Sequence, residues 1–215
     1  MTEEIPDPDT VETEEKKIDE AMEIWEDGNV PLVFGKYDIR EVVVHDPSLR
    51  RYINLSPRYV YTTSARHANR RFGKMKVNIV ERLINNMMRS EKYTGKKMKA
   101  YRVVEEAFDI IAHRTKKNPV QVLVNALECA SPMEEITRLR YGGISVPKAV
   151  DTSASRRLDI ALGNICKGAL KSSYKSKKSI ATCLANEIIK ASERSMDSFA
   201  VSKRDEIERV AASAR

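Results

Sequence analysis

Residues 134–151 read EEITRLRYGGISVPKAVD and form the least helical stretch of a chain that otherwise repeats its apolar residues at helical spacing. Two adjacent glycines, Gly142 and Gly143, separate two runs of alternating residues. A two-residue hairpin turn at these positions requires positive φ angles at both, which glycine adopts without strain. The stretch therefore predicts a β-hairpin at about residues 135–150 of a helical protein.

Pairing outward from this turn gives the hairpin an apolar face and an arginine-bearing face. The apolar face consists of Leu139, Tyr141, Ile144 and Val146. On the other face Arg140 lies opposite Ser145 and Arg138 lies opposite Pro147, in a non-hydrogen-bonded pair that tolerates proline. An isolated two-stranded hairpin is barely stable, so we expect it to pack on the helices or on a partner. Projecting arginines favour a phosphate backbone as that partner.

Apolar residues recur every three or four positions on both sides of the hairpin, which predicts helices with buried stripes. The predicted helices cover 77–88, 97–114, 118–131, 153–174 and 177–194, and a last one is capped by Ser202. Asn118 and Pro119 have the residue types of an N-cap and a first helical position. The fold class is therefore mainly α: a bundle-like helical domain with a projecting β-hairpin arm and an N-terminal extension.

Composition and pattern divide the chain into three regions. These are an acidic tail over 1–30, an extension with a basic arm over 31–76, and a helical domain over 77–215 that contains the hairpin.

Two short elements are expected in the N-terminal regions. Residues 13–27 carry a rough apolar stripe that is compatible with a short acidic helix. The β-branched run Val42–Val44, before the turn signal Asp46-Pro47, predicts a short strand within irregular chain.

The net charge of +7 is divided very unevenly along the chain. Residues 1–30 hold twelve acids and two lysines, whereas residues 31–215 hold nineteen acids and 36 bases, a net of +17. Such a basic body favours a polyanionic partner, although a solvated surface has a similar composition. No apolar run approaches the roughly 18 residues of a membrane span. The acidic start lacks the features of a secretion signal.

The candidate phosphate-binding cations gather in 65–78, in 167–178, on the hairpin and at three predicted helix starts. They are Arg66, Arg70, Arg71, Lys74, Lys76, Lys96, Lys97, Arg138, Arg140, Lys148, Arg156, Arg157, Lys171, Lys175, Lys177, Lys178, Lys203 and Arg204. Cations at a helix start oppose the helix dipole unless an anion is bound there. Each cluster alone is compatible with a solvated surface, but together they favour phosphate binding.

Motifs for catalysis, metals and cofactors fail on inspection. Gly95-Lys96 lacks the first glycine and the following Ser or Thr of a phosphate-binding loop. Pro147 stands where a nucleophile elbow requires glycine. Zinc-ligand spacing is absent among His45, His67 and His113. The wide-spaced Cys129, Cys166 and Cys183 argue for a reducing compartment and against a disulfide framework. We expect neither an enzyme nor a cofactor.

Several of these stretches together resemble one family, the universal S-seven family, which is ribosomal protein seven of the small subunit. The resemblance covers roughly residues 32–215, and its N-terminal part is similar to the archaeal and eukaryotic branch, with archaeal the better match. The matching stretches are LVFGKYDIREVVVHDPSLRRYINLSP (32–57), VNIVERLINNMM (77–88), GKKMKAYRVVEEAFDII (95–111), NPVQVLVNALECASP (118–132), YGGISVPKAVD (141–151), SRRLDIALGNICKGA (155–169) and KRDEIERVAASAR (203–215).

The resemblance implies a structural component of the small ribosomal subunit, located in the cytoplasm as part of the ribosome. It implies direct binding to the 3′ major domain of small-subunit rRNA, where the protein nucleates assembly of the subunit head. It also implies that the hairpin lies near the exit-site tRNA and the mRNA path, with neighbouring small-subunit proteins as partners. No membrane and no cofactor is implied.

Two other classes of protein are compatible with parts of the sequence. A helical DNA-binding regulator requires a recognition helix that reads bases, and no clear candidate turn precedes one here. A protein-interaction adaptor predicts a large exposed apolar patch in place of the basic body.

Overall fold

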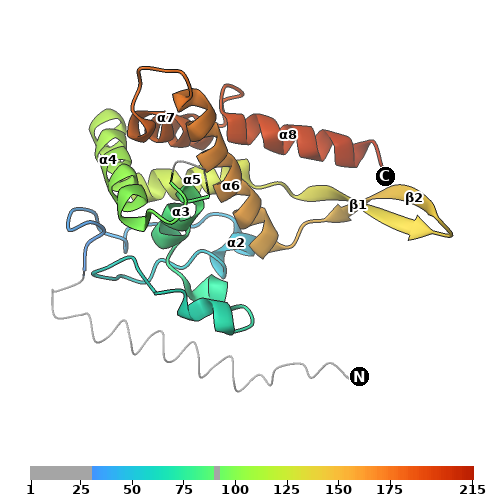
Figure 1. Ribbon diagram of the computed structural model, residues 1–215, viewed down its shortest axis with the longest axis horizontal. Helices are drawn as coiled ribbons and strands as arrows, with labels where there is room; N and C mark the ends of the chain where they lie inside the picture. Colours follow the sequence, from blue (N-terminus) through green and yellow to red (C-terminus); the bar gives the residue numbers. More distant parts are fainter. Residues whose placement is uncertain (1–30, 90–92) are drawn as a thin grey trace.

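The computed structural model describes residues 31–89 and 93–215, and within them the fold is mainly α with one two-stranded antiparallel sheet (Figure 1). The helices are α2 (Pro47–Arg50), α3 (Ile79–Met87), α4 (Lys97–Thr115), α5 (Pro119–Ala130), α6 (Ala154–Ser173), α7 (Ile180–Ser192) and α8 (Phe199–Ala212), and two 3₁₀ turns are η1 (Arg66–Asn69) and η2 (Gly73–Lys76). The hairpin strands are β1 (Glu134–Tyr141) and β2 (Ile144–Asp151). The predicted fold class is confirmed, while the acidic helix expected over 13–27 lies outside the described residues.

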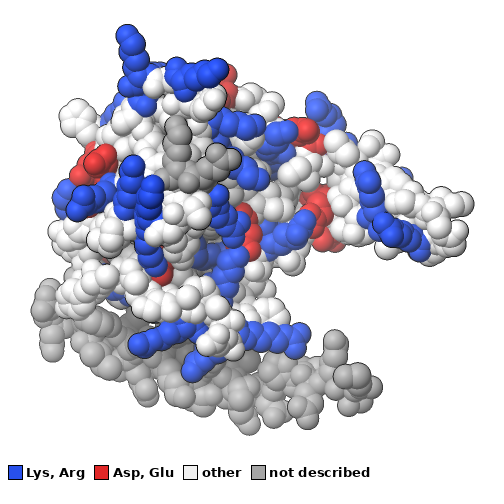
Figure 2. All heavy atoms as spheres, viewed as in Figure 1, with Lys and Arg blue, Asp and Glu red and all other residues white. Residues whose placement is uncertain are grey.

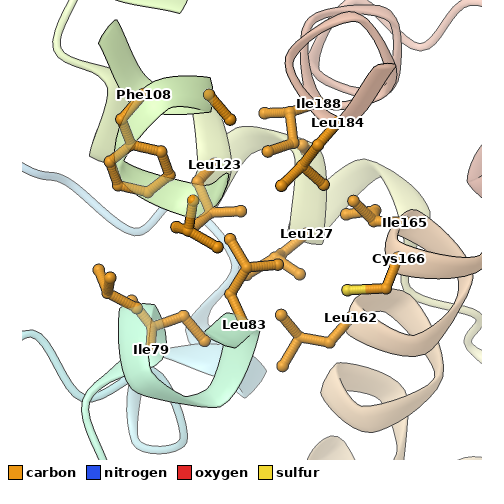
Figure 3. Packing of buried hydrophobic residues seen from close by; sticks show 14 of the residues in the cluster. Ile79, Leu83, Phe108, Leu123, Leu127, Leu162, Ile165, Cys166, Leu184 and Ile188 are labelled. Atoms are coloured by element: carbon orange, nitrogen blue, oxygen red, sulfur yellow. The ribbon is translucent and has the colours of Figure 1, made fainter. Parts of the chain in front are cut away.

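The core lies between α3, α4, α5, α6 and α7, whose apolar stripes face one another (Figure 3). Leu83, Leu127 and Leu162 come from three different helices and are completely buried. Helix α5 packs against α4, α6 and α7 at once. Its extensive burial follows from its sequence, because six of the eight residues from Val120 to Leu127 are apolar. The stripes are therefore core, as predicted.

Asparagine side chains begin two of the core helices. Asn118 accepts a hydrogen bond from the Val120 N–H at 3.0 Å, and Pro119 occupies the first helical position. Asn78 accepts from the Val80 N–H at 2.9 Å in the same way. Both side chains satisfy amide donors that a helix start leaves unpaired.

The cap of the last helix lies four residues before Ser202, so that predicted cap is wrong. Ser198 caps α8 and is itself completely buried. Its hydroxyl donates to Glu187 at 2.8 Å, and the same carboxylate accepts from the Ala200 N–H at 3.0 Å. Both serines are good caps by type, and the buried glutamate on α7 selects between them.

The strand predicted at Val42–Val44 is also wrong, because these residues form irregular chain. The amide of Val43 donates to the Gln121 Oε1 atom at 2.8 Å, and the Gln121 Nε2 atom donates to the Val43 carbonyl at 2.9 Å. A glutamine of α5 thus provides the two hydrogen bonds that a neighbouring strand would otherwise provide. The N–H and C=O groups of an extended backbone can be paired either by a neighbouring strand or by a side-chain amide.

The hairpin has the register that its sequence predicts. Arg138 is opposite Pro147 and Tyr141 is opposite Ile144. The φ angles of Gly142 and Gly143 are +53° and +89°, as the tight turn requires. Figure 1 shows the hairpin extending well beyond the helices, which confirms a projecting arm.

Contacts at the base of the hairpin hold it against the C-terminal part of the chain. The Ala149 N–H donates to the Ala214 carbonyl at 3.3 Å, and Arg215 forms an ion pair with Glu134. The Met133 N–H donates to Glu208 of α8 at 2.9 Å. The base of the arm therefore contacts α8 and the residues after it, and Glu135 of β1 also pairs with Arg156 of α6.

A buried arginine joins the N-terminal extension to the start of α6. Arg157 is 6% exposed, and its guanidinium donates to Asp46 at 2.8 Å, to Ser131 at 3.1 Å and to the Ser48 hydroxyl. Burial raises the pKa of Asp46, but hydrogen bonds from Ser48 and Arg157 outweigh burial and leave it below its usual value. These contacts fix where the chain enters and leaves the hairpin.

Two further carboxylates link separate elements. Glu81 of α3 is 1% exposed and accepts from Lys97 of α4 at 2.8 Å and from the Thr63 N–H at 2.9 Å. Asp159 of α6 accepts from Lys74 at 2.5 Å and from Arg82 at 2.9 Å. Burial raises the pKa of both groups, but these donors outweigh it and lower each pKa below the ordinary value.

The first prediction concerns the Arg157 ion pair. Arg157→Ala leaves Asp46 without its cation in a poorly solvated position, so we expect it to lower the free energy of unfolding by about 3 kcal/mol. The neighbouring Arg156 has a side chain 60% exposed, and Arg156→Ala should cost less than about 1 kcal/mol. Urea denaturation followed by circular dichroism measures both. Equal losses in the two variants would contradict a structural role for Arg157.

The second prediction concerns pH. Asp46, Glu81 and Asp159 have folded-state pKa values below their ordinary values of 3.8 for aspartate and 4.5 for glutamate. Their stabilising contribution is therefore complete above those ordinary values and is lost as the pH falls through them towards the lower folded-state pKa values.

The free energy of unfolding should accordingly decrease as the pH falls from 6 to 3. The double variant Glu81→Gln, Asp159→Asn should be less stable at pH 6 and lose less over the same interval. Urea denaturation at several pH values provides the measurement, and parallel curves for the two proteins would refute the assignment.

Candidate nucleic-acid interface

Exposed cations gather on three segments that lie far apart on the molecule. The first is the hairpin, with Arg138, Arg140 and Lys148. The second is the chain from residue 66 to residue 76, with Arg66, Arg70, Arg71 and Lys76. The third joins α6 to α7, with Lys171, Lys175, Lys177 and Lys178. Figure 2 shows that Lys and Arg side chains dominate the charge on the visible face, with few acids between them.

The hairpin presents cations on both faces and apolar side chains at its tip. Arg138 and Arg140 share one face, whereas Lys148 lies on the other because it is opposite Thr137. Tyr141 and Ile144 are 65% and 69% exposed. The described residues thus leave the apolar face of the tip uncovered. An exposed apolar tip on a projecting arm is suited to contact a partner molecule.

The 66–76 segment is docked on the helices by its ends, so it is a fixed feature and not a loose arm. The Asn54 side chain donates to the Lys76 carbonyl at 2.7 Å. Lys74 pairs with Asp159, and the preceding Thr63 donates its N–H and hydroxyl to Glu81. Between these anchors the backbone makes two consecutive 3₁₀ turns with the arginines outward.

The third segment combines lysines with aromatic rings. The Lys171 Nζ atom lies 4.3 Å from the centroid of the Phe199 ring, and the Lys175 Nζ atom lies 5.6 Å from that of Tyr174. Lys177 and Lys178 precede α7, which begins at Ile180 and not at Lys177 as predicted. All four lysines are exposed.

Six of the candidate cations form ion pairs with acids in the part of the chain that the structure describes. Their partners are Asp159 for Lys74, Glu81 for Lys97, Glu135 for Arg156, Asp46 for Arg157, Glu206 for Lys203, and Asp205 and Glu208 for Arg204. Arg157 is the most buried of them and serves the fold, as described above. Arg204 also donates to the Cys129 carbonyl at the end of α5.

The prediction of three helix starts with paired cations is only partly right. Lys96 and Lys97 do begin α4, where Lys96 is exposed and lacks a side-chain capping bond. In α6 the pair lies in the first turn, but only Arg156 faces solvent. Lys203 and Arg204 lie in the second turn of α8, because Ser198 is the cap. Lys203 and Arg204 therefore lie too far into α8 to bind an anion at its N-terminus, whereas the pairs of α4 and α6 lie within the first turn.

Two arginines that the sequence reasoning passed over lie beside the second segment. Arg82 and Arg89 line a small pocket together with His67 and Lys74. They are seven residues apart on and just after α3, a spacing that places them on one face. This seven-residue spacing could have indicated that the two arginines share a face. The apolar stripe of the same helix is the stronger pattern, so the sequence predicts only a core helix here.

The described residues show no sign of the other chemistries considered. Cys129, Cys166 and Cys183 are free thiols. Residues 31–89 and 93–215 contain no group of three or more His, Cys, Asp or Glu side chains arranged to hold a metal ion. None of the helices in this part of the chain is both long and apolar enough to cross a membrane.

A helical domain with a projecting hairpin and several separate basic surfaces is the arrangement expected of a structural protein that binds RNA. The family model described as ribosomal protein S7p/S5e matches residues 49–215. The chain belongs to this family, and it is therefore a structural component of the small ribosomal subunit and not an enzyme. The ribosome places it in the cytoplasm.

Proteins named small ribosomal subunit protein uS7 are similar over most of the chain. The protein from Archaeoglobus fulgidus is 61% identical over 184 residues, which are 86% of this chain and 95% of that protein. The one from Picrophilus torridus is 58% identical over 86% of this chain and 98% of its own length. The one from Methanococcus aeolicus is 58% identical over 85% and 98%. The archaeal relatives agree with the branch that the N-terminal extension suggested, and family membership removes the support for a DNA-binding regulator or an adaptor.

Proposed function

We propose that the protein binds the 3′ major domain of small-subunit rRNA directly and nucleates assembly of the subunit head. In this proposal the hairpin extends towards the exit-site tRNA and the mRNA path, and neighbouring small-subunit proteins complete its surroundings. Membership of the ribosomal family supports an rRNA partner. The choice of rRNA domain is our inference.

The observation that carries the proposal is the separation of the three basic surfaces. The hairpin tip, the 66–76 segment and the α6–α7 junction emerge in different directions from one rigid helical body (Figure 1). A single straight duplex cannot reach all three, whereas a folded RNA with several helices can. Phosphate contacts at separate points read the shape of an RNA and position the protein on it. This arrangement suits a protein that holds several rRNA helices together.

The hairpin is the best candidate for contacts beyond the primary RNA site. Its base is fixed to α8 and its tip carries exposed Tyr141 and Ile144 beside Arg138 and Arg140. Apolar residues next to cations suit a junction where RNA meets another protein or a second RNA. This mixture supports a position at the edge of the head, close to the tRNA and mRNA.

Binding to a transcript of the 3′ major domain tests the main proposal. We expect the full chain to bind it more tightly than an unrelated structured RNA of equal length, with affinity that falls steeply as salt is raised. A filter-binding titration at several salt concentrations gives both results. Equal affinity for the two RNAs would leave a general polyanion binder and overturn the proposed specificity.

Substitution of the hairpin arginines tests the arm. Arg138→Ala with Arg140→Ala removes two phosphate-binding cations, so the slope of log K against log salt should fall by about 2 or less. Lys117→Ala with Lys190→Ala removes the same charge from exposed lysines outside the three surfaces and should leave the slope nearly unchanged. The same slope in both double variants would show that the hairpin makes no phosphate contact.

A further inference from the structure

Phe72 is an exposed aromatic side chain in an unusual backbone conformation. Phe72 is 63% exposed, and its φ angle of +56° lies in the left-handed region that residues other than glycine rarely adopt. Ser64 and Ala65 in the same part of the chain also have positive φ angles, of 49° and 58°. A fold keeps such conformations where other contacts enforce them, and they cluster at binding sites.

The ring of Phe72 already has a cationic neighbour on one side. The guanidinium carbon of Arg71 lies 5.2 Å from the ring centroid. The exposure of the ring leaves its remaining surface open to solvent. Unpaired RNA bases stack on such rings and on arginine planes, and this stacking depends little on which base is present.

A basic pocket lies on the inner side of the same segment. It measures 130 Å³ and is lined by His67, Lys74, Arg82, Asn85, Asn86 and Arg89, together with Val77. Pockets that enclose whole small molecules measure roughly 300–1,000 Å³. This pocket is therefore the size of a single group, such as one phosphate.

The charges around this pocket favour an anion. Lys74 and Arg82 share the one carboxylate of Asp159, and Arg89 adds a third cation without an ion pair to a described residue. Arg82 is only 3% exposed, and its Nε atom has no hydrogen-bond partner in the described structure. A buried donor without a partner costs free energy that an incoming acceptor would recover.

Close packing of the two 3₁₀ turns fixes the backbone of the segment that carries both features. A Cβ atom on Gly73 would lie 2.5 Å from the His67 carbonyl oxygen, so η2 packs on η1 only because residue 73 is glycine. Phe72 stands two residues before Lys74, so that their Cα atoms are no more than about 7 Å apart. The ring and one residue of the pocket lining are thus separated by a single residue of the chain.

We propose that the 66–76 segment and α3 together bind one unpaired RNA nucleotide, with its base stacked on Phe72 and its phosphate in the pocket beside Arg82 and Arg89. This rests on the proposed rRNA-binding function and gives it a local element that recognises single-stranded RNA. A fully paired RNA cannot occupy the site, because its bases are already stacked. The basic pocket lined by residues of the same segment favours a nucleotide over an apolar peptide as the occupant.

The test compares variants of Phe72 in the full chain for binding to the 3′ major-domain transcript. Phe72→Ala and Phe72→Leu should each weaken binding by about fivefold to a hundredfold, because stacking of a base requires a π face. Phe72→Tyr should bind like the parent protein. Met196→Ala is the control, since Met196 is 65% exposed in the turn before α8 and should change nothing.

The salt dependence separates the ring from the pocket. Phe72→Ala removes no charge and should leave the salt slope unchanged, whereas Arg89→Ala should lower it by about 1 or less. Phe72→Leu that binds as tightly as the parent protein would overturn the proposal. Circular dichroism melting of each variant identifies loss of fold, and Phe72→Tyr and Phe72→Leu keep the test informative if Phe72→Ala unfolds.

A second probe distinguishes failure of this inference from failure of the proposed function. A 12-nucleotide single-stranded RNA and a fully paired RNA of the same length contain no rRNA structure. We expect Phe72→Leu to weaken binding to the single strand and not to the duplex. If the parent protein shows no preference for the rRNA transcript but Phe72 still matters for the single strand, the rRNA proposal fails and this one stands. If the transcript is preferred and Phe72 matters for neither probe, the reverse holds.

Discussion

The ion pair between Arg157 and Asp46 holds the architecture around the hairpin in place. The guanidinium contacts the extension before α2, the end of α5 through Ser131 and, by its own position, the start of α6. The hairpin leaves the body directly after α5 and returns directly before α6. One buried cation therefore determines the mutual position of the two chain segments from which the arm grows. Taking that cation out of water is tolerable only because its partners surround it.

The buried Glu81 and the half-buried Asp159 pair with some of the cations of this basic protein, while other cations stay exposed. Glu81 and Asp159 each draw a lysine into the gaps between elements, together with Thr63 or Arg82, and so convert part of the positive charge into internal ties. The cations that stay outside emerge on the hairpin, the 66–76 segment and the α6–α7 junction. Some of the bases thus stabilise the fold through ion pairs, and the others give the surface its positive potential. The positions of the acids determine which role each base has.

Much of the fold follows from local residue patterns that can be recognised in the sequence. The Gly142-Gly143 turn set the strand register, since only that pairing closes a two-residue loop, and Asn118 with Pro119 marked the start of α5. The predictions were wrong where the local sequence was equally compatible with two structures. Ser198 and Ser202 are both suitable caps, and Val42–Val44 suits either a strand or an extended segment bound by Gln121. Contacts between residues distant in sequence made each choice.

For the candidate site, too, some features follow from the sequence and others from tertiary contacts. The sequence by itself determined the mainly α class, the hairpin and its register, and the excess of positive charge over residues 31–215. These depend on periodicity, turn chemistry and composition, which act between near neighbours. Only the tertiary structure decided that Arg157 is buried while Arg156 is exposed, and that Arg82 and Arg89 meet His67 at one pocket. Adjacent cations on a helix point in different directions, and their partners come from elements brought together by packing alone.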